Sequence, residues 1–312
     1  MTFNTLNSLG KKREPFLFIS DFKGENLEVF SLDTLQNEDI EFCIDEHYSL
    51  TPHTEFLKKI PLPFEDYKTK FDAIIEKIKS GETYLLNLTQ PTKIETSLSI
   101  QEIYKYANAH YKLRYKDAFV CFSPEKFVQI SGERIHTFPM KGTIDASIAD
   151  AKEQILANQK EMAEHVMVVD LLRNDLSIVA EDVRVERFRY VEELYAGEKK
   201  LLQVSSHISG FIGEDWHEKI GDILKALLPA GSISGAPKKS TLQIIEETEG
   251  YERGFFSGVF GVYDGEKLDS GVMIRFVEKT PSGYIYKSGG GITLDSDAKS
   301  EYNELLDKIY LP

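Results

Sequence analysis

Two pairs of glutamates share a spacing that suits the binding of a hard metal ion. Glu161 and Glu164 lie three residues apart, and Glu301 and Glu304 repeat this spacing near the C-terminus. Side chains three residues apart leave the same side of a helix, so each pair directs its carboxylates the same way. Carboxylates this close repel each other unless a positive group lies near them, and Mg²⁺ prefers such oxygen ligands. The two pairs together favour a cation site. For either pair alone, solvated glutamates that complement a helix dipole remain the alternative.

Two helices must carry these acids. Residues 160–177 place apolar side chains behind the glutamates at helical spacing, which predicts a helix whose buried face includes Val166 and Val169. Residues 296–308 predict a second helix with Ser296 as its N-cap. We therefore expect both acid pairs on helices that pack against the core.

Backbone groups that can hold an anion are expected in two places. Gly289, Gly290 and Gly291 precede the second helix, and such a run lets N–H groups face a ligand, although it is also compatible with a plain turn. Residues 228–239 form a Gly/Ser loop before a helix that starts near Pro237, and a helix start attracts carboxylates or phosphates. This loop lacks the P-loop spacing, which disfavours nucleotide binding.

Two further positively charged residues are Arg275, in an apolar stretch, and Lys141, at a strand end. Arg275 is the one charged residue of the apolar stretch 271–277, which predicts a strand. A buried guanidinium needs a planar anionic partner, which is either a ligand or an internal acid. Lys141 lies between Pro139 and Gly142 at a strand end, where the local pattern is typical of a solvated turn lysine.

Composition limits the class of protein. The chain has 312 residues, 41% of them hydrophobic, and a formal net charge of −14. This charge disfavours a nucleic-acid or anionic membrane surface, so a small-molecule ligand fits better. Cys43 and Cys121 are the two cysteines, and both have apolar neighbours, as expected for reduced core thiols. The first residues lack a signal-peptide pattern and no run is long enough to span a bilayer, so we expect a cytoplasmic protein.

Short strands joined by tight turns dominate the middle of the chain. Residues 118–122, 126–130 and 134–138 predict antiparallel hairpins rather than alternating parallel units. Residues 97–111 predict a helix, and residues 82–90 predict a strand that runs into Pro91. The pattern therefore favours mixed helices and antiparallel sheet.

These segments together resemble one family, the chorismate-utilising enzymes, which includes anthranilate, isochorismate, salicylate and aminodeoxychorismate synthases. The resemblance covers roughly residues 65–312. Its motifs are residues 81–90, 123–125, 139–143, 160–175, 231–238, 258–261, 274–275 and 289–308. The resemblance implies an α+β fold in which two antiparallel sheets pack together with helices outside. It also implies one catalytic domain over residues 1–312, with a shortened N-terminal part of about residues 1–64.

Lys141 distinguishes the branches of this family. Anthranilate synthases resemble P-I-A-G-T at residues 139–143, whereas aminodeoxychorismate synthases resemble P-I-K-G-T, and this chain has P-M-K-G-T. The lysine therefore points to aminodeoxychorismate formation. Isochorismate and salicylate synthases carry a base lysine on the strand that corresponds to residues 82–90, and this chain has none there. Activation of water by that route is disfavoured.

The resemblance also implies a role for each site residue. Lys141, neutral because burial beside Mg²⁺ lowers its pKa, would attack ring carbon C2, and Glu125 would protonate the departing C4 hydroxyl. Mg²⁺ would be held by Glu164 and Glu301, with Glu161 and Glu304 beside them. The carboxylates of chorismate would be oriented by Ser232, Gly235, Arg275, Gly289, Gly290, Gly291 and Lys308. Ammonia from a separate glutamine amidotransferase subunit would then displace the lysine.

Two departures from the family pattern limit this transfer. Gln203 stands where family members carry a histidine, and His207, four positions later, does not inherit that role. The short N-terminal part also makes feedback control by an amino acid unexpected. Two alternatives stay open: component I of anthranilate synthase, and a chorismate-binding subunit without catalytic activity. The glutaminase partner, the ammonia route and the oligomeric state stay open as well.

Overall fold

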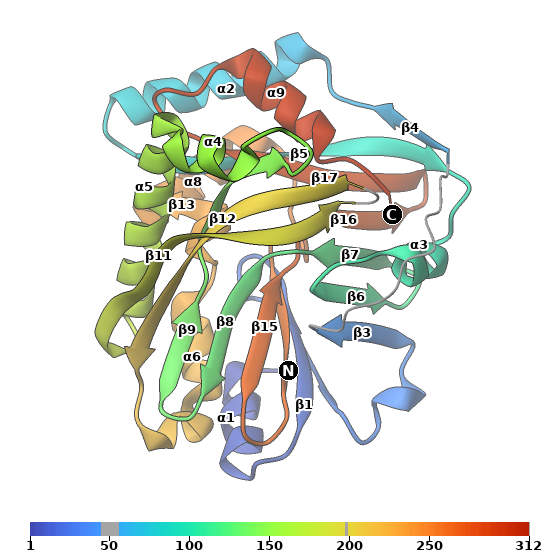
Figure 1. Cartoon of the computed structure of the whole chain (residues 1–312). Coiled ribbons are helices and arrows are strands. Elements are labelled where there is room, and N and C mark those ends of the chain that lie inside the picture. Colours follow the sequence, from blue (N-terminus) through green and yellow to red (C-terminus); the bar gives the residue numbers. More distant parts are fainter. Residues whose placement is uncertain (45–55, 197–198, 312) are drawn as a thin grey trace.

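Two antiparallel sheets form the centre of the computed structural model, which describes residues 1–44, 56–196 and 199–311 (Figure 1). The first sheet has the order β10-β12-β9-β8-β15-β14-β1-β2, and β11 pairs with β12. Its strands are β1 (Phe16–Ser20), β2 (Leu27–Ser31), β8 (Lys126–Ser131), β9 (Arg134–Thr137), β10 (Met140–Asp145), β11 (Glu181–Ala196), β12 (Lys199–Phe211), β14 (Val259–Tyr263) and β15 (Leu268–Val272).

The second sheet has the order β13-β5-β17-β16-β7-β6-β3, and β4 pairs with β5. Its strands are β3 (Ile40–Ile44), β4 (Leu57–Ile60), β5 (Leu85–Thr96), β6 (Tyr111–Tyr115), β7 (Phe119–Ser123), β13 (Gly235–Ala236), β16 (Phe276–Thr280) and β17 (Gly283–Ile292). The N-terminal residues thus supply strands to both sheets, since β1 and β2 join the first and β3 joins the second.

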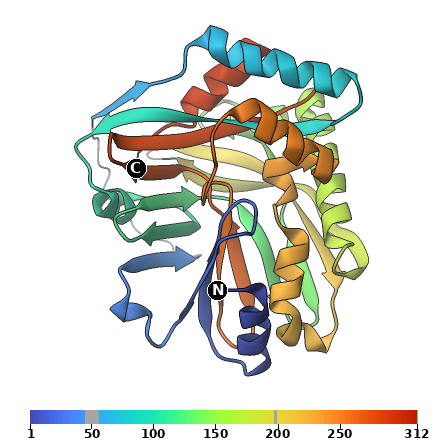
Figure 2. The same cartoon turned by 180° about the vertical axis from the view of Figure 1, so that it is seen from behind.

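Helices cover the outer faces of the sheets (Figures 1 and 2). In the first view α2 and α9 lie above β5 and β17, while α1 and α6 lie behind the first sheet. The helices are α1 (Phe3–Lys11), α2 (Phe64–Lys79), α3 (Ile100–Tyr106), α4 (Ala151–Ala157), α5 (Gln159–Leu176), α6 (Ile220–Leu227), α7 (Gly231–Ser234), α8 (Lys238–Glu249) and α9 (Ala298–Asp307), with the 3₁₀ turns η1 (Leu35–Asn37) and η2 (Glu214–Lys219).

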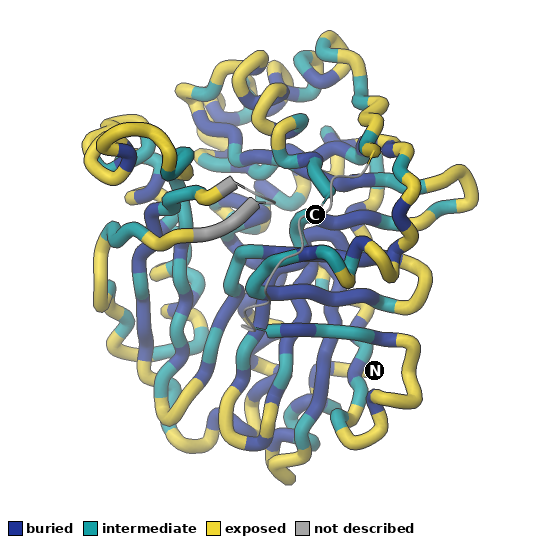
Figure 3. The backbone as a smooth tube through the Cα atoms, turned by 45° about the vertical axis from the view of Figure 1, so that its right-hand side comes forward, coloured by how far each residue is buried: buried dark blue, intermediate teal, exposed yellow. Residues whose placement is uncertain are grey.

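The core lies where the two sheets face each other and beneath the helices. Tyr111 of β6 meets Phe260 of β14 edge to face, with ring centroids 6.3 Å apart, and its hydroxyl donates to Asp269 of β15 over 2.7 Å. An aromatic pair of this kind stabilises by about 0.5–1.5 kcal/mol beyond its burial. Figure 3 shows buried residues along the strands and exposed residues at the turns. The α+β class with two packed antiparallel sheets is confirmed.

Two boundaries differ from the sequence prediction. The helix expected over residues 97–111 is α3 alone, because Ser99 and Glu102 form a capping box at its start and Tyr111 already belongs to β6. The strand expected to end at Pro91 continues to Thr96. On the edge away from β17, β13 pairs only with residues 85–86 and β4 only with 93–96, so the missing N–H of Pro91 removes no bond to a third described strand.

Two sequence-level expectations about the environment can be compared with the structure. Cys43 and Cys121 are both buried, as expected of core thiols. Within residues 1–44, 56–196 and 199–311, every helix is too short or too polar to cross a membrane.

Candidate active site

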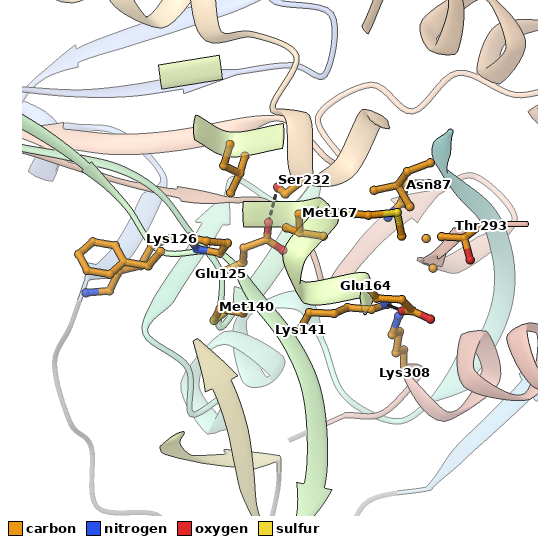
Figure 4. A pocket seen from close by; sticks show the side chains of 17 residues that line it. Asn87, Glu125, Lys126, Met140, Lys141, Glu164, Met167, Ser232, Thr293 and Lys308 are labelled. Carbon is orange, nitrogen blue, oxygen red and sulfur yellow. Dashed lines mark hydrogen bonds and ion pairs between the residues drawn. The ribbon is translucent and has the colours of Figure 1, made fainter. Parts of the chain in front are cut away.

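A cavity of about 150 Å³ opens between α5, β5, β17 and the β7–β8 turn (Figure 4). It brings together seven of the residues expected at the site, namely Glu125, Lys141, Glu164, Ser232, Gly290, Gly291 and Lys308. The other lining residues are Leu85, Asn87, Lys126, Phe138, Pro139, Met140, Met167, Val168, Leu172 and Thr293. The cavity therefore joins segments that are far apart in the sequence.

Lys141 reaches this cavity from a bulge in β10. Between Met140 and Thr143 the pairing with β12 shifts by one residue, and Gly142 has a φ of +91° that favours glycine. A bulge bends a strand and redirects a side chain. The Lys141 ammonium lies 2.8 Å from Glu164 Oε2 on α5. The interpretation of Lys141 as a solvated turn lysine is therefore wrong.

The surroundings of Lys141 stabilise its charge. Burial by itself lowers the pKa of its ammonium. The carboxylates of Glu164, Glu304 and Glu161 raise that pKa by more than burial lowers it, so the pKa lies above the ordinary lysine value. The expectation of a neutral amine applied to Lys141 beside Mg²⁺ and stays a prediction. Anything that neutralises these carboxylates would remove the cause of the raised pKa.

Four carboxylates from α5 and α9 form an acid cluster beside Lys141: Glu161, Glu164, Glu301 and Glu304. Burial raises the pKa of Glu161 and Glu301, and the neighbouring carboxylates raise both further. Ser296 donates to Glu301 Oε1 over 2.8 Å, while Asp297 accepts the N–H of Ser300. Asp297 is thus the N-cap of α9, and the prediction of Ser296 as the cap is wrong.

The donors of the acid cluster suit Mg²⁺, because all four are carboxylates with hard oxygen atoms. Two of these carboxylates form ion pairs with lysines: Glu164 is paired with Lys141, and Glu304 lies 2.7 Å from Lys308. No group of three or more acid, histidine or cysteine side chains in the described residues is gathered closely enough to hold an ion in this arrangement. Binding by the whole cluster would require the lysines to release their partners.

The glycine run lies in a strand and not in a turn. Gly289, Gly290 and Gly291 belong to β17 and pair with residues 87–89 of β5. On the other edge β16 stops at Phe276, opposite Lys287, so the glycines have no strand there among the described residues. A Cβ at Gly290 would lie 3.3 Å from Glu301 Oε2 and 3.6 Å from Lys308 Nζ. Glycine thus lets β17 approach the acid cluster closely.

Glu125 lies at the opposite side of the cavity from Lys308 in Figure 4. Ser232 Oγ donates to Glu125 Oε1 over 2.5 Å, so Ser232 holds an internal acid in this structure. Burial raises the pKa of Glu125, although Ser232, Arg275 and Lys308 oppose that shift. A carboxyl with a raised pKa retains a proton that it can donate to a leaving group.

Arg275 and Gly235 lie outside the cavity lining. Arg275 stands between β15 and β16 with a φ of +52°, so its placement inside a strand was wrong. Its Nε is buried and has no hydrogen-bond partner in the part of the chain that the structure describes, which leaves a donor available near Glu125. Gly235 pairs with Leu86, and a Cβ there would lie 1.9 Å from the Leu85 carbonyl oxygen. Gly235 is needed for close packing of β13 on β5 and does not face the cavity.

Sequence reasoning missed several residues of the site. Asn87 of β5 lines the cavity, and its position in the strand by itself did not distinguish a residue that faces a ligand from a solvated one. Val166, which was expected on the buried face of its helix, is 45% exposed. The neighbouring His165 is fully buried instead, because α5 packs against β10 and β12 on the His165 side. Gln203 pairs with Thr143 of β10 but does not line the cavity. Apolar periodicity alone gives no signal for a buried histidine.

Comparison with known proteins identifies the family. The profile of chorismate binding enzymes matches residues 31–311. A Haemophilus influenzae protein named "Uncharacterized PabA-like protein" is 47% identical over 310 residues, covering 98% of this chain and 94% of that protein. The chain therefore belongs to the chorismate-binding enzyme family.

More distant relatives have named activities. Aminodeoxychorismate synthase component 1 of Bacillus subtilis is 33% identical over 259 residues, covering 77% of this chain but only 54% of that enzyme. Anthranilate synthase component I of Streptococcus pneumoniae superimposes with a TM-score of 0.68 at 26% identity, over 84% of this chain and 60% of that one. The menaquinone-specific isochorismate synthase of Escherichia coli gives a TM-score of 0.75 at 15% identity, over 97% and 79%, which shows a shared fold.

Proposed function

We propose that this chain aminates chorismate to 4-amino-4-deoxychorismate, as the aminating component of an aminodeoxychorismate synthase in 4-aminobenzoate and folate synthesis. The observation that carries the proposal is the position of Lys141, which a bulge in β10 directs against Glu164 at the edge of the cavity. A primary amine placed there can act as a nucleophile once it loses its proton. The Bacillus subtilis relative supports the same reaction.

The reaction balances with the groups present. The Lys141 amine attacks ring carbon C2 and forms a C–N bond, the ring double bond shifts, and the C4 hydroxyl leaves as water with a proton from Glu125. Ammonia then forms a bond to C4, the double bond shifts back, and the bond between C2 and the lysine breaks. The proton that ammonia loses restores Glu125. The net change replaces the C4 hydroxyl with an amino group.

Substrate binding would use the cationic and backbone groups around the cavity. Lys308 and the free edge of Gly290 and Gly291 lie on one side, and the free donor of Arg275 lies near the other. These groups suit the two carboxylates of chorismate. Glu164 and Glu301 would hold Mg²⁺, with Glu161 and Glu304 beside them. Bound Mg²⁺ would withdraw charge from the ring carboxylate and neutralise the acids that raise the pKa of Lys141.

We further propose that the ammonia comes either from solution or from a separate glutamine amidotransferase subunit. An assay with ammonium salts or with glutamine distinguishes the two sources of ammonia. The isolated chain should use ammonium salts without glutamine. Glutamine should support turnover only after the partner subunit is added.

Lys141→Ala tests the proposed reaction. The purified chain is incubated with chorismate, Mg²⁺ and ammonium, and the products are identified by mass and fluorescence. The parent should form aminodeoxychorismate and, when ammonia is withheld, a covalent adduct on the peptide that contains Lys141. The variant should lose the adduct and slow by several orders of magnitude, because a covalent step lowers the barrier by several kcal/mol.

Lys160→Ala is the matched control, because Lys160 is a half-exposed lysine on α5 that lies 3.8 Å from Glu164. It should keep most of the activity. Anthranilate as the product of the parent chain would instead identify an anthranilate synthase component. Binding of chorismate without any turnover would identify a non-catalytic subunit. An alanine variant of Lys141 that forms aminodeoxychorismate at the parent rate would show that the covalent mechanism is wrong.

A further inference from the structure

Two imidazoles on neighbouring strands face each other in the first sheet. His136 lies in β9 and His207 in β12, and His136 Nδ1 is 3.0 Å from His207 Nε2. Both residues are half-buried. Ser206, the residue before His207, contacts His165 of α5, and successive side chains of a strand point to opposite faces. The imidazole pair therefore lies on the face of β12 away from α5, which carries two acids of the acid cluster.

The strand register explains why the two rings meet. His136 lies directly opposite Gln129 of β8 on one side and Ser209 of β12 on the other. Because Ser209 and His207 are two residues apart in β12, their side chains leave the same face. A diagonal neighbour on that face is within reach of an aromatic side chain. Phe138, which lines the cavity, stacks on the His207 ring with centroids 4.8 Å apart and so fixes its orientation.

One carboxylate and one guanidinium lie beside the pair on this face. Glu186 belongs to a bulge of β11, next to the residue that pairs with His207. Ser209 Oγ donates to Glu186 Oε1 over 2.5 Å, and Arg134 Nη2 lies 3.6 Å from the same oxygen. Glu186 favours a positive charge at His207, and Arg134 opposes it. The two charges balance, so the immediate surroundings do not repel a cation.

Both rings are neutral, and the hydrogen between them can be relocated. Burial lowers the pKa of His136 and of His207 below the ordinary histidine value, and the closeness of the two rings lowers that of His136 further. In the observed contact one neutral ring donates its single N–H to the other. The donor can carry that hydrogen on its other nitrogen instead. His136 Nδ1 and His207 Nε2 then both present lone pairs, and no proton has to be released.

The distance between these two nitrogens suits one transition-metal ion. Imidazole nitrogens bind such ions at about 2.0–2.1 Å. Two nitrogens at this distance are about 2.9 Å apart when they form a right angle at the ion, and about 3.4 Å apart in a tetrahedron. The observed 3.0 Å is closer to the right angle. Right angles between ligands are typical of Cu²⁺ and Ni²⁺, which also bind imidazole more tightly than the earlier divalent metals do.

We propose that His136 and His207 form a chelating site for Cu²⁺ or Ni²⁺. Within residues 1–44, 56–196 and 199–311 no group of three acids, histidines or cysteines is placed to hold an ion, so water completes the coordination. The bound ion ties β9 to β12 directly before Phe138. This site is separate from the acid cluster, whose carboxylates suit Mg²⁺, and it does not rest on the proposed function.

Calorimetric titration with Ni²⁺ in excess Mg²⁺ tests the site, because Mg²⁺ competes for carboxylates and leaves imidazoles available. The parent chain should bind Ni²⁺ at this pair. His136→Gln and His207→Gln should each weaken binding by more than about 100-fold, since loss of an outer partner of a ligand alone costs about 10–100-fold. His110→Gln, which replaces another half-buried histidine, is the matched control and should bind as the parent does.

Electron paramagnetic resonance with Cu²⁺ counts the nitrogen ligands directly. The parent and His110→Gln should show coupling to two imidazole nitrogens, and each variant of the pair should show one at most. Thermal unfolding in a chelator checks that the variants fold. His136→Gln decides the question by itself, because it leaves the ring that stacks on Phe138 in place. A parent spectrum without nitrogen coupling, or two nitrogens retained in His136→Gln, would overturn the proposal, as would equal Ni²⁺ affinity of parent and variant.

Discussion

Two clusters of charged residues lie on the two sides of β5 and β17, and they differ in how completely their charges are matched. The first is the structural network, which consists of Glu249, Arg253, Thr89, Lys70 and Lys287. The second is the acid cluster of Glu161, Glu164, Glu301 and Glu304. Both contain a buried carboxylate, Glu249 in the first and Glu301 in the second, so burial alone does not distinguish a structural pair from a reactive site.

In the structural network each charge meets a partner. Arg253 forks onto Glu249, with Nε and Nη2 at 2.8 and 2.6 Å from its two carboxylate oxygens. Its remaining donors reach the carbonyls of Ile233 and Asn87, and the N–H and hydroxyl of Thr89 donate to Glu249. The network thus fixes residues next to Ser232 and at the cavity wall. These contacts engage the charged groups of Arg253 and Glu249 with each other and with the backbone, as expected of a structural ion pair.

Among the residues that the structure describes, the carboxylates of the acid cluster outnumber the lysines paired with them. Four acids share Lys141, Lys160 and Lys308, and the pKa of Glu161 and of Glu301 is raised. A folded protein retains such repulsion where a ligand or cation later compensates it. Unmatched charge, rather than buried charge, therefore distinguishes the side of β5 and β17 that carries the candidate active site.

Removal of an acid from the acid cluster should have the largest effect. Glu164→Gln or Glu301→Gln should lower turnover about 10⁴-fold, which corresponds to roughly 5 kcal/mol of barrier, because each removes charge from the proposed Mg²⁺ site. Glu161→Gln and Glu304→Gln should cost only about 10–100-fold if these acids support the ligands without binding the ion. Calorimetric titration with Mg²⁺ should show the same ranking. Near-normal activity of Glu164→Gln in the presence of a chelator would show that the metal assignment is wrong.

The structural network should respond in stability. Arg253→Met leaves Glu249 as an unpaired buried charge, so the free energy of unfolding should fall by about 3–5 kcal/mol. Urea denaturation of parent and variant measures the change. The double variant Arg253→Met with Glu249→Leu should recover much of that loss, since no buried charge remains. A loss below about 1 kcal/mol in the single variant would contradict the distinction between the two clusters.

Glu125 should give a smaller effect with a defined pH dependence. Its pKa is raised, so the acid form needed to protonate the leaving hydroxyl persists below the raised pKa. The rate of that step should fall about tenfold per pH unit above it, and Glu125→Gln should cost about 10²-fold at low pH. The folded state binds this proton more tightly than the unfolded state does. Stability should therefore be lost as pH rises from the ordinary glutamate pKa through the raised one, and Glu125→Gln should abolish that loss.

Removal of an exposed ion pair should have the smallest effect on the free energy of unfolding. Lys11 and Glu218 lie 2.8 Å apart with side chains 66% and 52% exposed. Lys11→Met should leave the free energy of unfolding nearly unchanged, because solvent screens the pair. Denaturation at low and high salt measures this change together with that of Arg253→Met. An equal loss in both variants would show that burial does not set the energy of these pairs.

Much of the local structure followed from the sequence. The two acid-bearing helices were expected at residues 160–177 and 296–308 and occur as α5 and α9, because apolar residues at helical spacing define an element whatever it packs against. The strands β7, β8 and β9 also occur where short apolar runs separated by turn residues predicted them, and β8 and β9 form a hairpin. The predicted pairing of β7 with β8 was wrong, because the chain crosses between them from the second sheet to the first. The motif around Lys141, through its resemblance to a family, directed attention to a residue that lines the cavity.

Only the tertiary structure decided how these elements form a site. Local periodicity does not encode which strands pair, so it could not show that the glycine run belongs to β17, that Arg275 lies between strands, or that Ser232 holds Glu125. The bulge that aims Lys141 at Glu164 depends on register with β12, which is set by contacts about sixty residues away in the chain. The burial of His165 depends on the same packing. The sequence thus determined which groups could do chemistry, and the long-range pairing of strands decided which of them meet.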